Sequence, residues 1–303
     1  MADEADQADE EVLTDLADLE RAVAAAFETG DDRSLRILGY GEITLVLGSP
    51  ADQPTRACKR LPVFRDRSAA AAYRALFDRY LDHLTACGVV PVASELVELP
   101  GPGGTVISYV VQPVLAPDPL VPEVLRAAEP DAEHPVLAAI CAAVPQVVDE
   151  RNGLDGQVSN WAVLADGQLA SLDVTTPMLF DAHGRTELEL DLFLAAYPWL
   201  LRAPIGRFVA PGVIGAYRDP RHVLLDLAGN LVKERLEPWL PAAVTAANRQ
   251  LDRPISEEEA RRYYRSDARL WEAMLRLRRA DRWWQRQVRR RAYPFLLPGP
   301  VTR

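Results

Sequence analysis

The sequence is poor in lysine, cysteine and histidine. Of its 34 basic residues only Lys59 and Lys233 are lysines, and the chain has 3 cysteines and 4 histidines. The cysteines, Cys58, Cys87 and Cys141, are odd in number and far apart. This pattern argues against a disulfide framework or a zinc site and predicts small buried hydrophobic residues. No two histidines have the four-residue spacing of a helical metal site.

Long apolar runs are also missing. No stretch reaches the roughly 20 apolar residues that a membrane-spanning helix needs. The first 20 residues, MADEADQADEEVLTDLADLE, are acidic and have neither the basic start nor the apolar stretch of a signal peptide. We therefore expect a cytoplasmic protein without a membrane partner.

The charge is negative overall but unevenly distributed. The net charge is −10, with acidic residues gathered at the N-terminus and arginines at the C-terminus. A negative total makes a nucleic-acid partner unlikely on electrostatic grounds. With 303 residues, 49% of them hydrophobic and 26% charged, the chain has an ordinary globular composition and enough length for two lobes.

The first 113 residues alternate between helical and β-type patterns. Residues 1–11 are predicted to be a solvated acidic tail, and the apolar spacing from Thr14 to Phe27 predicts an amphipathic helix that Gly30 ends. The alanine-rich segment 68–87 carries its large apolar residues on one face and predicts a second helix. Strands are expected at 34–41, 42–49, 55–64, 93–99 and 105–114.

Beyond a proline-rich boundary the pattern is mostly helical. Prolines at 113, 117, 119 and 122 interrupt regular structure, so we predict a tail and helix over 1–32, a β-rich lobe over 33–113 and a helical lobe over 114–303. Helices are expected over 134–150 and over 186–201, where Thr186 and Glu189 have capping-box spacing. Ser256 and Glu259 repeat that spacing before an arginine- and tryptophan-rich segment that ends near Tyr293.

The arginine- and tryptophan-rich segment has two interpretations. Its basic and aromatic residues would suit phosphate or membrane contact. Its apolar residues also fit a packed amphipathic helix, which we favour, with its arginines paired with acidic groups such as those of the N-terminal helix. A protein partner for this basic helix is a further option. The residues that predict packing are Trp271, Met274, Leu275, Leu277, Trp283, Trp284 and Val288.

A hairpin is predicted within residues 153–177, GLDGQVSNWAVLADGQLASLDVTTP. Asp166 and Gly167 are the preferred pair for a two-residue type I′ turn. Counting outward from that turn, Trp161 faces Leu172, and Asn160 faces Asp173. Opposed residues in an antiparallel pair have Cβ atoms roughly 5 Å apart, so the last pair would converge on one cation.

Two oxygen donors at the open end of a hairpin suit Mg²⁺, which is usually held by one or two protein groups together with substrate phosphates. Asp155, five residues before Asn160, could accept a proton from an attacking hydroxyl. The alternative is that the Asn and Asp simply cap turns at the end of an Asp-Gly hairpin. The hairpin alone leaves this choice open.

The order of these motifs resembles the protein-kinase-like superfamily. Asp155-x-x-x-x-Asn160, a hairpin and Asp173 resemble its catalytic loop and metal-binding segment. GYGEITLV, from Gly39 to Val46, resembles the glycine-rich loop with Thr44 in place of the third glycine, and Lys59 in ACK resembles the strand lysine that pairs with ATP phosphates.

The resemblance spans about residues 33–180 and is closest to the aminoglycoside phosphotransferase and choline kinase branch. It implies an α+β, two-lobed protein-kinase-like fold, with a small antiparallel β-sheet and one helix in the N-lobe and a mainly helical C-lobe. It also implies ATP and Mg²⁺ as cofactors and a small-molecule hydroxyl as acceptor.

The resemblance assigns a role to each matched residue. Gly39, Gly41 and Thr44 would approach the ATP phosphates. Lys59 would position those phosphates, and the segment from Gln112 to Leu115 would offer backbone groups to adenine. The metal ligands would be Asn160 and Asp173, and Asp155 would orient the acceptor hydroxyl.

Two departures support a second hypothesis, a catalytically inactive kinase-like module that binds nucleotide or a partner as a regulator. Gly153 and Leu154 stand where the family has its loop histidine motif, and the helix over 68–87 has no glutamate to pair with Lys59. Asp78 has a workable spacing, but its position beside the apolar face favours a solvated acid near Arg74. A third possibility is an unrelated α+β scaffold. The acceptor and the oligomeric state stay open.

Overall fold

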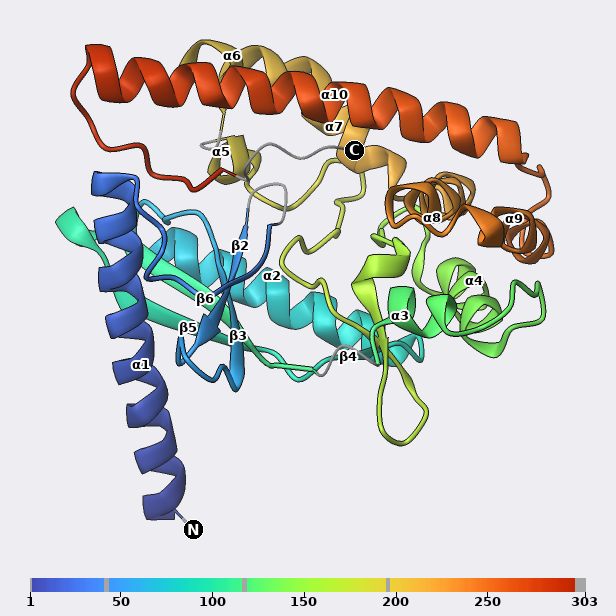
Figure 1. The fold of residues 1–303 in the computed structure, drawn as a ribbon, viewed down its shortest axis with the longest axis horizontal. Helices are drawn as coiled ribbons and strands as arrows, with labels where there is room; N and C mark the ends of the chain where they lie inside the picture. Colours follow the sequence, from blue (N-terminus) through green and yellow to red (C-terminus); the bar gives the residue numbers. More distant parts are fainter. Residues whose placement is uncertain (1, 41–43, 116–118, 195–196, 298–303) are drawn as a thin grey trace.

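The computed structural model describes residues 2–40, 44–115, 119–194 and 197–297 (Figure 1). The fold is α+β and 51% helical, with an antiparallel five-stranded sheet and a small second sheet. Within the described part of the chain, no helix has both the length and the apolar character needed to cross a membrane.

The five-stranded sheet is a compact platform with β3 at its centre. Its strand order is β1-β2-β3-β6-β5, and every neighbouring pair is antiparallel. In β3, Lys59 lies opposite Val46 on one side and Val110 on the other. The strands are β1 (Ile37–Tyr40), β2 (Leu45–Ser49), β3 (Arg56–Arg60), β5 (Glu95–Pro100) and β6 (Val106–Pro113).

A helix covers each face of this sheet. Successive side chains of β6 point to opposite faces. Tyr109 and Val111 therefore pack with the apolar residues of α1 (Ala2–Thr29), and Val110 packs with those of α2 (Arg67–Ala86). The structure corrects the predicted tail over 1–11, because α1 already begins at Ala2. Its alanines, acids and leucines all tolerate helix, and no glycine or proline interrupts them.

The core beneath α2 continues into the helical half. Buried residues of α2, α4, α8 and α9 form one apolar cluster with the sheet residues Leu96 and Val110. The longer helices there are α4 (Pro135–Val147), α8 (Pro220–Lys233), α9 (Leu240–Asn248) and α10 (Glu257–Trp283). The short elements there are α3 (Val121–Arg126), α5 (Leu190–Leu194), α6 (Trp199–Pro204), α7 (Ala210–Ala216), η2 (Val158–Asn160), η3 (Ile205–Val209), η4 (Glu237–Trp239) and η5 (Trp284–Val288), and η1 (Pro102–Gly104) lies between β5 and β6.

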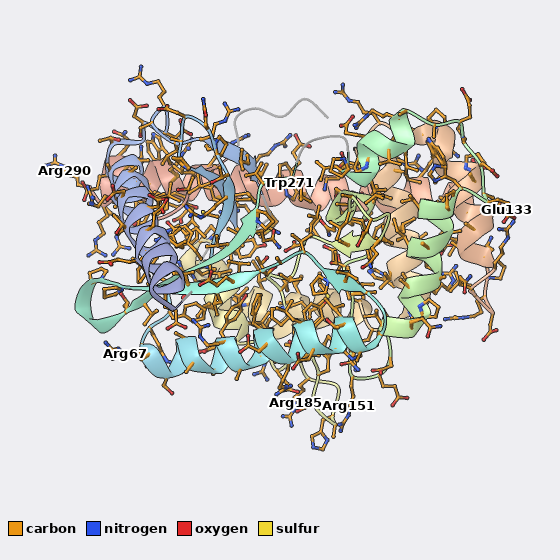
Figure 2. The ribbon with its side chains drawn as sticks, turned by 90° about the horizontal axis from the view of Figure 1, so that it is seen from below. Arg67, Glu133, Arg151, Arg185, Trp271 and Arg290 are labelled. Atoms are coloured by element: carbon orange, nitrogen blue, oxygen red, sulfur yellow. The ribbon has the colours of Figure 1, made fainter. Side chains whose placement is uncertain are left out.

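Helix α10 runs along the molecule from the helical half to the side where α1 lies (Figure 1). Figure 2 shows Glu133 and Arg290 at opposite sides of the molecule, with Trp271 of α10 between them. The predicted cap is confirmed here, because the Ser256 side chain accepts a hydrogen bond from the Glu259 amide at 3.1 Å.

The predicted helix over 186–201 is correct only in part, because its start is extended and the range contains α5 and the beginning of α6 instead of one continuous helix. Thr186 is extended and forms an isolated antiparallel bridge with Phe180, and its hydroxyl accepts from the Leu188 amide at 3.1 Å. These contacts hold the chain out of helix until α5 begins at Leu190, and a second helix, α6, begins after Pro198. The capping-box spacing is present, but the local bridge between Thr186 and Phe180 decides the backbone there.

A small sheet connects the helical half to the end of α2. β4 (Val90–Pro91) follows α2 and pairs in parallel with β8 (Leu169–Ser171), which pairs with β7 (Trp161–Val163) as an antiparallel hairpin. The segment after β8 is thereby fixed beside the N-terminal half of the chain.

The hairpin register differs by one residue from the prediction. Trp161 lies opposite Ser171, and Val163 lies opposite Leu169. The Leu164 amide donates to the Gln168 carbonyl at 2.8 Å and the Gly167 amide to Leu164 at 2.8 Å, so the turn has three residues instead of two. Gly167 takes the left-handed conformation, with φ +83°, that this longer turn needs.

The corrected register changes the pairing at the open end. The backbone carbonyl of Asn160 accepts from the Leu172 amide at 2.8 Å, so Leu172 is the partner of Asn160 and Asp173 lies one residue beyond it. A shift of one residue moves a side chain to the other face of a strand. Hairpin geometry alone therefore does not bring Asn160 and Asp173 onto one face.

Candidate functional site

Lys59 joins the central strand of the large sheet to the segment after the hairpin. Its Nζ donates to the Leu172 carbonyl at 2.6 Å and lies 3.7 Å from Asp173 Oδ1. The lysine is buried, whereas the Asp173 side chain keeps 36% of its surface exposed. The structure thus brings together two predicted site residues that are more than a hundred positions apart in the sequence.

Asp173 is held as a carboxylate. Its Oδ1 accepts from the Thr175 amide at 3.1 Å and from the Thr175 hydroxyl at 2.8 Å. Removal from water raises the pKa of Asp173, but the Lys59 charge and the Thr175 hydrogen bonds outweigh it and leave the pKa below its ordinary value. Because Lys59 and Thr175 both contact Oδ1, Oδ2 is the oxygen that these contacts leave for a further ligand.

Gln112 fixes the same carbonyl from a neighbouring strand. Its side-chain amide donates to Leu172 at 2.9 Å and to the Ser94 hydroxyl at 2.9 Å, and the residue is buried. In β6 it lies opposite Ala57. The Leu172 carbonyl therefore accepts two hydrogen bonds, which position the start of the Asp173 segment. The proposed contact of the Gln112 backbone with adenine stays a prediction.

The predicted phosphate loop is described only at its two ends. Gly39 pairs with Val46, and an added Cβ there would meet Val46 at an ordinary 3.9 Å. Thr44 is half-buried directly before β2. Gly41 lies outside the described residues. The space around Gly39 therefore does not itself demand a glycine, and the phosphate role of this loop stays a prediction.

Two tyrosines of α2 hold the segments that carry the predicted site residues. The Tyr73 hydroxyl donates to the Thr175 carbonyl at 2.9 Å, and the Tyr80 hydroxyl donates to the Gly153 carbonyl at 3.2 Å. Both are buried, and their seven-residue spacing places them on one face of the helix. Asp78 is exposed on α2, so the acidic group beside Lys59 comes from Asp173.

Asp155 lies in the loop between Gly153, which Tyr80 contacts, and η2. Its Oδ1 accepts from the Gln157 amide at 3.2 Å, and its side chain is half-buried. Burial raises the pKa of the Tyr80 hydroxyl, and the charges of Asp155 and Asp173 raise it further. The charges of both carboxylates therefore act on the Tyr80 hydroxyl, and the role of Asp155 as a proton acceptor stays a prediction.

A polar network on α8 contacts the loop that contains Asp155 and Gln157. The Gln157 amide donates to Asp226 Oδ2 at 3.0 Å, and the Asn230 amide donates to Gln157 Oε1 at 3.1 Å. The backbone amide of Ser159 donates to Asn230 Oδ1 at 3.3 Å, and Lys233 Nζ approaches Gln157 Oε1 at 3.4 Å. One face of α8 therefore fixes the residues between Asp155 and Asn160.

Asp226 differs from Asp173 in the direction of its pKa shift. Burial raises its pKa to about 6, the charge of Asp267 adds to this effect, and hydrogen bonds from Gln157 and Tyr263 oppose it. The residue is 5% exposed. Burial has the largest effect on the pKa of Asp226. The charge of Lys233 opposes the rise but acts only weakly, so the pKa stays raised.

The residues that fix the site were not identified from the sequence. Tyr73 and Tyr80 belong to the apolar pattern of α2, and their hydroxyls give no signal in that pattern. A polar face did exist on the helix over 220–233, where Asp226, Asn230 and Lys233 have helical spacing within an otherwise apolar segment. That spacing could have pointed to a buried polar contact.

The two predicted metal ligands, Asp173 and Asn160, can hold a metal ion only together with other ligands. Among the described residues, no group of three His, Cys, Asp or Glu side chains could hold a metal. The predicted ligands are one carboxylate, Asp173, and one amide, Asn160. Such a set suits Mg²⁺ when it is also bound by water and substrate phosphates.

The comparisons with known proteins give a family but no activity. No curated protein matches the chain. A family model described as a family of unknown function, DUF6206, matches residues 18–282. This match includes the five-stranded sheet, both tethering tyrosines, the hairpin and α8. The chain belongs to the DUF6206 family.

Proposed function

We propose that this protein is an ATP- and Mg²⁺-dependent phosphotransferase that acts on the hydroxyl of a small molecule. The proposal includes the two-lobed kinase-like arrangement predicted from the motif order. The observation that carries it is the position of Lys59, whose Nζ lies 2.6 Å from the Leu172 carbonyl and 3.7 Å from Asp173 Oδ1.

This pairing favours a phosphate site over a purely structural ion pair. Lys59 is buried, but its carboxylate partner is one-third exposed and is kept ionised. A pair with one exposed partner contributes little to stability, because water screens the exposed charge. An anchored ammonium beside an accessible carboxylate can instead bind the phosphates of a nucleotide and the cation that accompanies them.

The remaining residues have roles in the transfer. The acceptor oxygen attacks the γ-phosphorus, the bond from that phosphorus to the β,γ-bridging oxygen breaks, and ADP leaves. The acceptor proton passes to Asp155. Lys59 neutralises phosphate charge, and Asp173 and Asn160 would hold Mg²⁺, which offsets the remaining negative charge when bound. Gln157 and Tyr80 position the Asp155 loop.

A regulator that binds nucleotide without turnover is the second candidate. The observation that favours it is that the Lys59 ammonium is already satisfied by Asp173 and the Leu172 carbonyl, while Asp78, the acid of α2 with a workable spacing, is exposed. In such a module the same groups would bind nucleotide, and Asp155 would have no chemical role.

Nucleotide binding and turnover separate these candidates. We expect ATP with Mg²⁺ to raise the thermal midpoint, and Asp173→Ala to abolish that rise. A phosphotransferase also hydrolyses ATP slowly to ADP and phosphate, and Asp155→Asn removes this activity while ATP binding persists. The matched control is Asp78→Asn, which changes an exposed acid on α2 and leaves both results unchanged.

Each candidate has its own contradicting result. ATP binding with neither hydrolysis nor transfer to any member of a broad panel of amino alcohols and sugars would favour the regulator. A thermal midpoint that ATP and Mg²⁺ leave unchanged would contradict both. Hydrolysis that survives in Asp155→Asn would show that the proton acceptor is a different group.

A further inference from the structure

Helix α10 and η5 carry an exposed apolar stripe, which we name the α10 seam. Leu270, Leu277 and Trp284 have seven-residue spacing and are 51%, 41% and 47% exposed. Ala273 and Ala280, which lie between them, are exposed as well. At 3.6 residues per turn these five residues fall on one side of the helix, in the alternating three- and four-residue spacing of a helix–helix contact.

The seam is separate from the side that packs on the protein. The buried residues of α10 are Ala260, Leu275 and Arg278. The packed helix predicted from the sequence is therefore only partly correct, because Leu277, Trp283, Trp284 and Val288 are exposed. A surface helix needs one apolar side, and a second contiguous one marks an interaction surface.

Arginines follow the seam at the same spacing. Arg262, Arg269 and Arg276 are seven residues apart, and the last two directly precede Leu270 and Leu277. All three are exposed, and Arg262 and Arg276 also pair with Glu258 and Glu272 of the same helix. The whole segment 261–291 contains 12 arginines and 3 acidic residues. A partner for this side should therefore be an acidic amphipathic helix, and a second α10 is disfavoured because it would bring like charges together.

The chain itself contains a helix of that kind. Residues 1–20 have nine acidic side chains and no basic one. On α1, Leu13, Ala17 and Ala24 are exposed and lie on one side, and Glu10 and Glu28 extend that side in both directions. Arg21 also lies on this side and is paired with Asp18. The small apolar residues with flanking acids complement the α10 seam.

The fold keeps these two helices apart within one molecule. α1 is fixed to the sheet through Leu16, Leu19 and Val23, which are buried. It extends away from α10 toward its N-terminus (Figure 1). The two segments meet at the other end of α1, where Arg286 Nη2 donates to the Phe27 carbonyl at 2.9 Å. At this end the arginine contacts a backbone carbonyl of α1 instead of the acidic side chain that the sequence predicts as its partner.

We propose that the α10 seam binds the exposed side of α1 from a second copy of the chain. If each copy presents both helices, two such contacts form at once around a two-fold axis, and the assembly closes as a dimer. Apolar contact at Leu270, Leu277 and Trp284 supplies the affinity, and the charges select α1 over a second α10. This inference does not depend on the proposed function.

Charge reversal with mixing tests the pairing. One variant carries Glu10→Arg and Glu28→Arg, and the other carries Arg269→Glu and Arg276→Glu. In sedimentation velocity we expect the wild type to dimerise at low salt, and each variant alone to dimerise at least about tenfold more weakly. An equimolar mixture restores the dimer, because a mixed pair again joins opposite charges.

The matched control is Arg289→Glu with Arg290→Glu, an equal charge change at exposed positions beyond the seam residues. It should leave the dimer unchanged, and circular dichroism of every variant should match the wild type. A wild type that stays monomeric at low salt and tens of micromolar chain would overturn the proposal. So would variants that dimerise normally, or a monomer that sediments with phosphatidylserine vesicles through the same arginines.

Discussion

Asp173, in the candidate site, and Asp226, behind the loop that carries Asp155, have pKa values shifted in opposite directions. Asp173 meets a lysine ammonium and two hydrogen bonds from Thr175, and its pKa is lowered. Asp226 meets the neutral amide of Gln157 with only weak help from Lys233, and its pKa is raised to about 6. The acid whose charged form the protein stabilises is the more exposed one, which suits binding, whereas the enclosed one, whose charged form is penalised by burial, suits positioning of a loop.

The largest expected loss of folding stability follows removal of the Lys59 ammonium. Lys59→Met leaves Asp173 without its cationic partner and the Leu172 carbonyl without its nearest donor. Breaking a buried charge pair costs about 3–5 kcal/mol, and the exposure of Asp173 reduces this to about 2 kcal/mol. Urea unfolding at pH 7 measures the loss. An unchanged midpoint would mean that the pair is not formed in solution.

The acid dependence of the same pair has a definite direction. A lowered pKa means that Asp173 contributes stability above its unfolded pKa, and that this contribution is lost as the pH falls through the folded value. Lys59→Met should therefore lose less stability than the wild type between about pH 5 and pH 2. Equal losses in both proteins would show that other groups govern the acid transition.

Asp226 should show the reverse behaviour. With its pKa raised to about 6, its contribution to stability is full below the unfolded pKa and is lost as the pH rises through 6. Asp226→Asn keeps an oxygen for the Gln157 amide and removes the buried charge. We expect a gain of about 1–2 kcal/mol at pH 7 and none at pH 4, by urea unfolding at both values.

The control for Asp226 is an acid of the same type at the surface. Asp166→Asn, in the exposed turn of the hairpin, should change stability by less than about 0.5 kcal/mol at either pH. A destabilised Asp226→Asn at pH 7 would contradict this interpretation, because it would mean that the ionised carboxylate is the form that positions Gln157.

The two tyrosine tethers allow a smaller, paired test. Tyr73→Phe and Tyr80→Phe each remove one buried hydroxyl and leave a carbonyl, of Thr175 or Gly153, without its donor. Each should cost about 1–2 kcal/mol in urea unfolding. If the proposed function is correct, Tyr80→Phe should also lower ATP hydrolysis, because it loosens the Asp155 loop, and a change in stability alone would leave that role unsupported.

The strands and helices around the site were easier to predict from the sequence than the register and contacts between them. The strands on both sides of Lys59 and the helix over 68–87 were recognisable because apolar periodicity is local. The hairpin register was missed by one residue because Asp-Gly also fits a three-residue turn. Gly167 is left-handed in both turns, and the difference is at Asp166, which would need a positive φ in a type I′ turn and does not have one here.

The helix expected from Thr186 failed because a local bridge to Phe180, six residues earlier, holds Thr186 extended. Other contacts depended on distant partners. The contact of Lys59 with Asp173 and the Leu172 carbonyl was not expected, because the resemblance gives Lys59 and Asp173 separate roles around one nucleotide and nothing local in the sequence indicates a direct pairing. Gln157 and Asp226 are 69 positions apart, and no spacing rule joins them. The exposure of Trp284 likewise follows from which side of α10 the fold covers.

Lys59 and Asp173 are, in our proposal, one site for nucleotide phosphates and their cation. The most direct measurement is a calorimetric titration of the full chain with ATP, with and without Mg²⁺, repeated on Asp173→Ala. We expect binding that Mg²⁺ strengthens in the wild type and that Mg²⁺ no longer strengthens in the variant. No heat of binding in the wild type, or equal Mg²⁺ dependence in both proteins, would contradict the proposal.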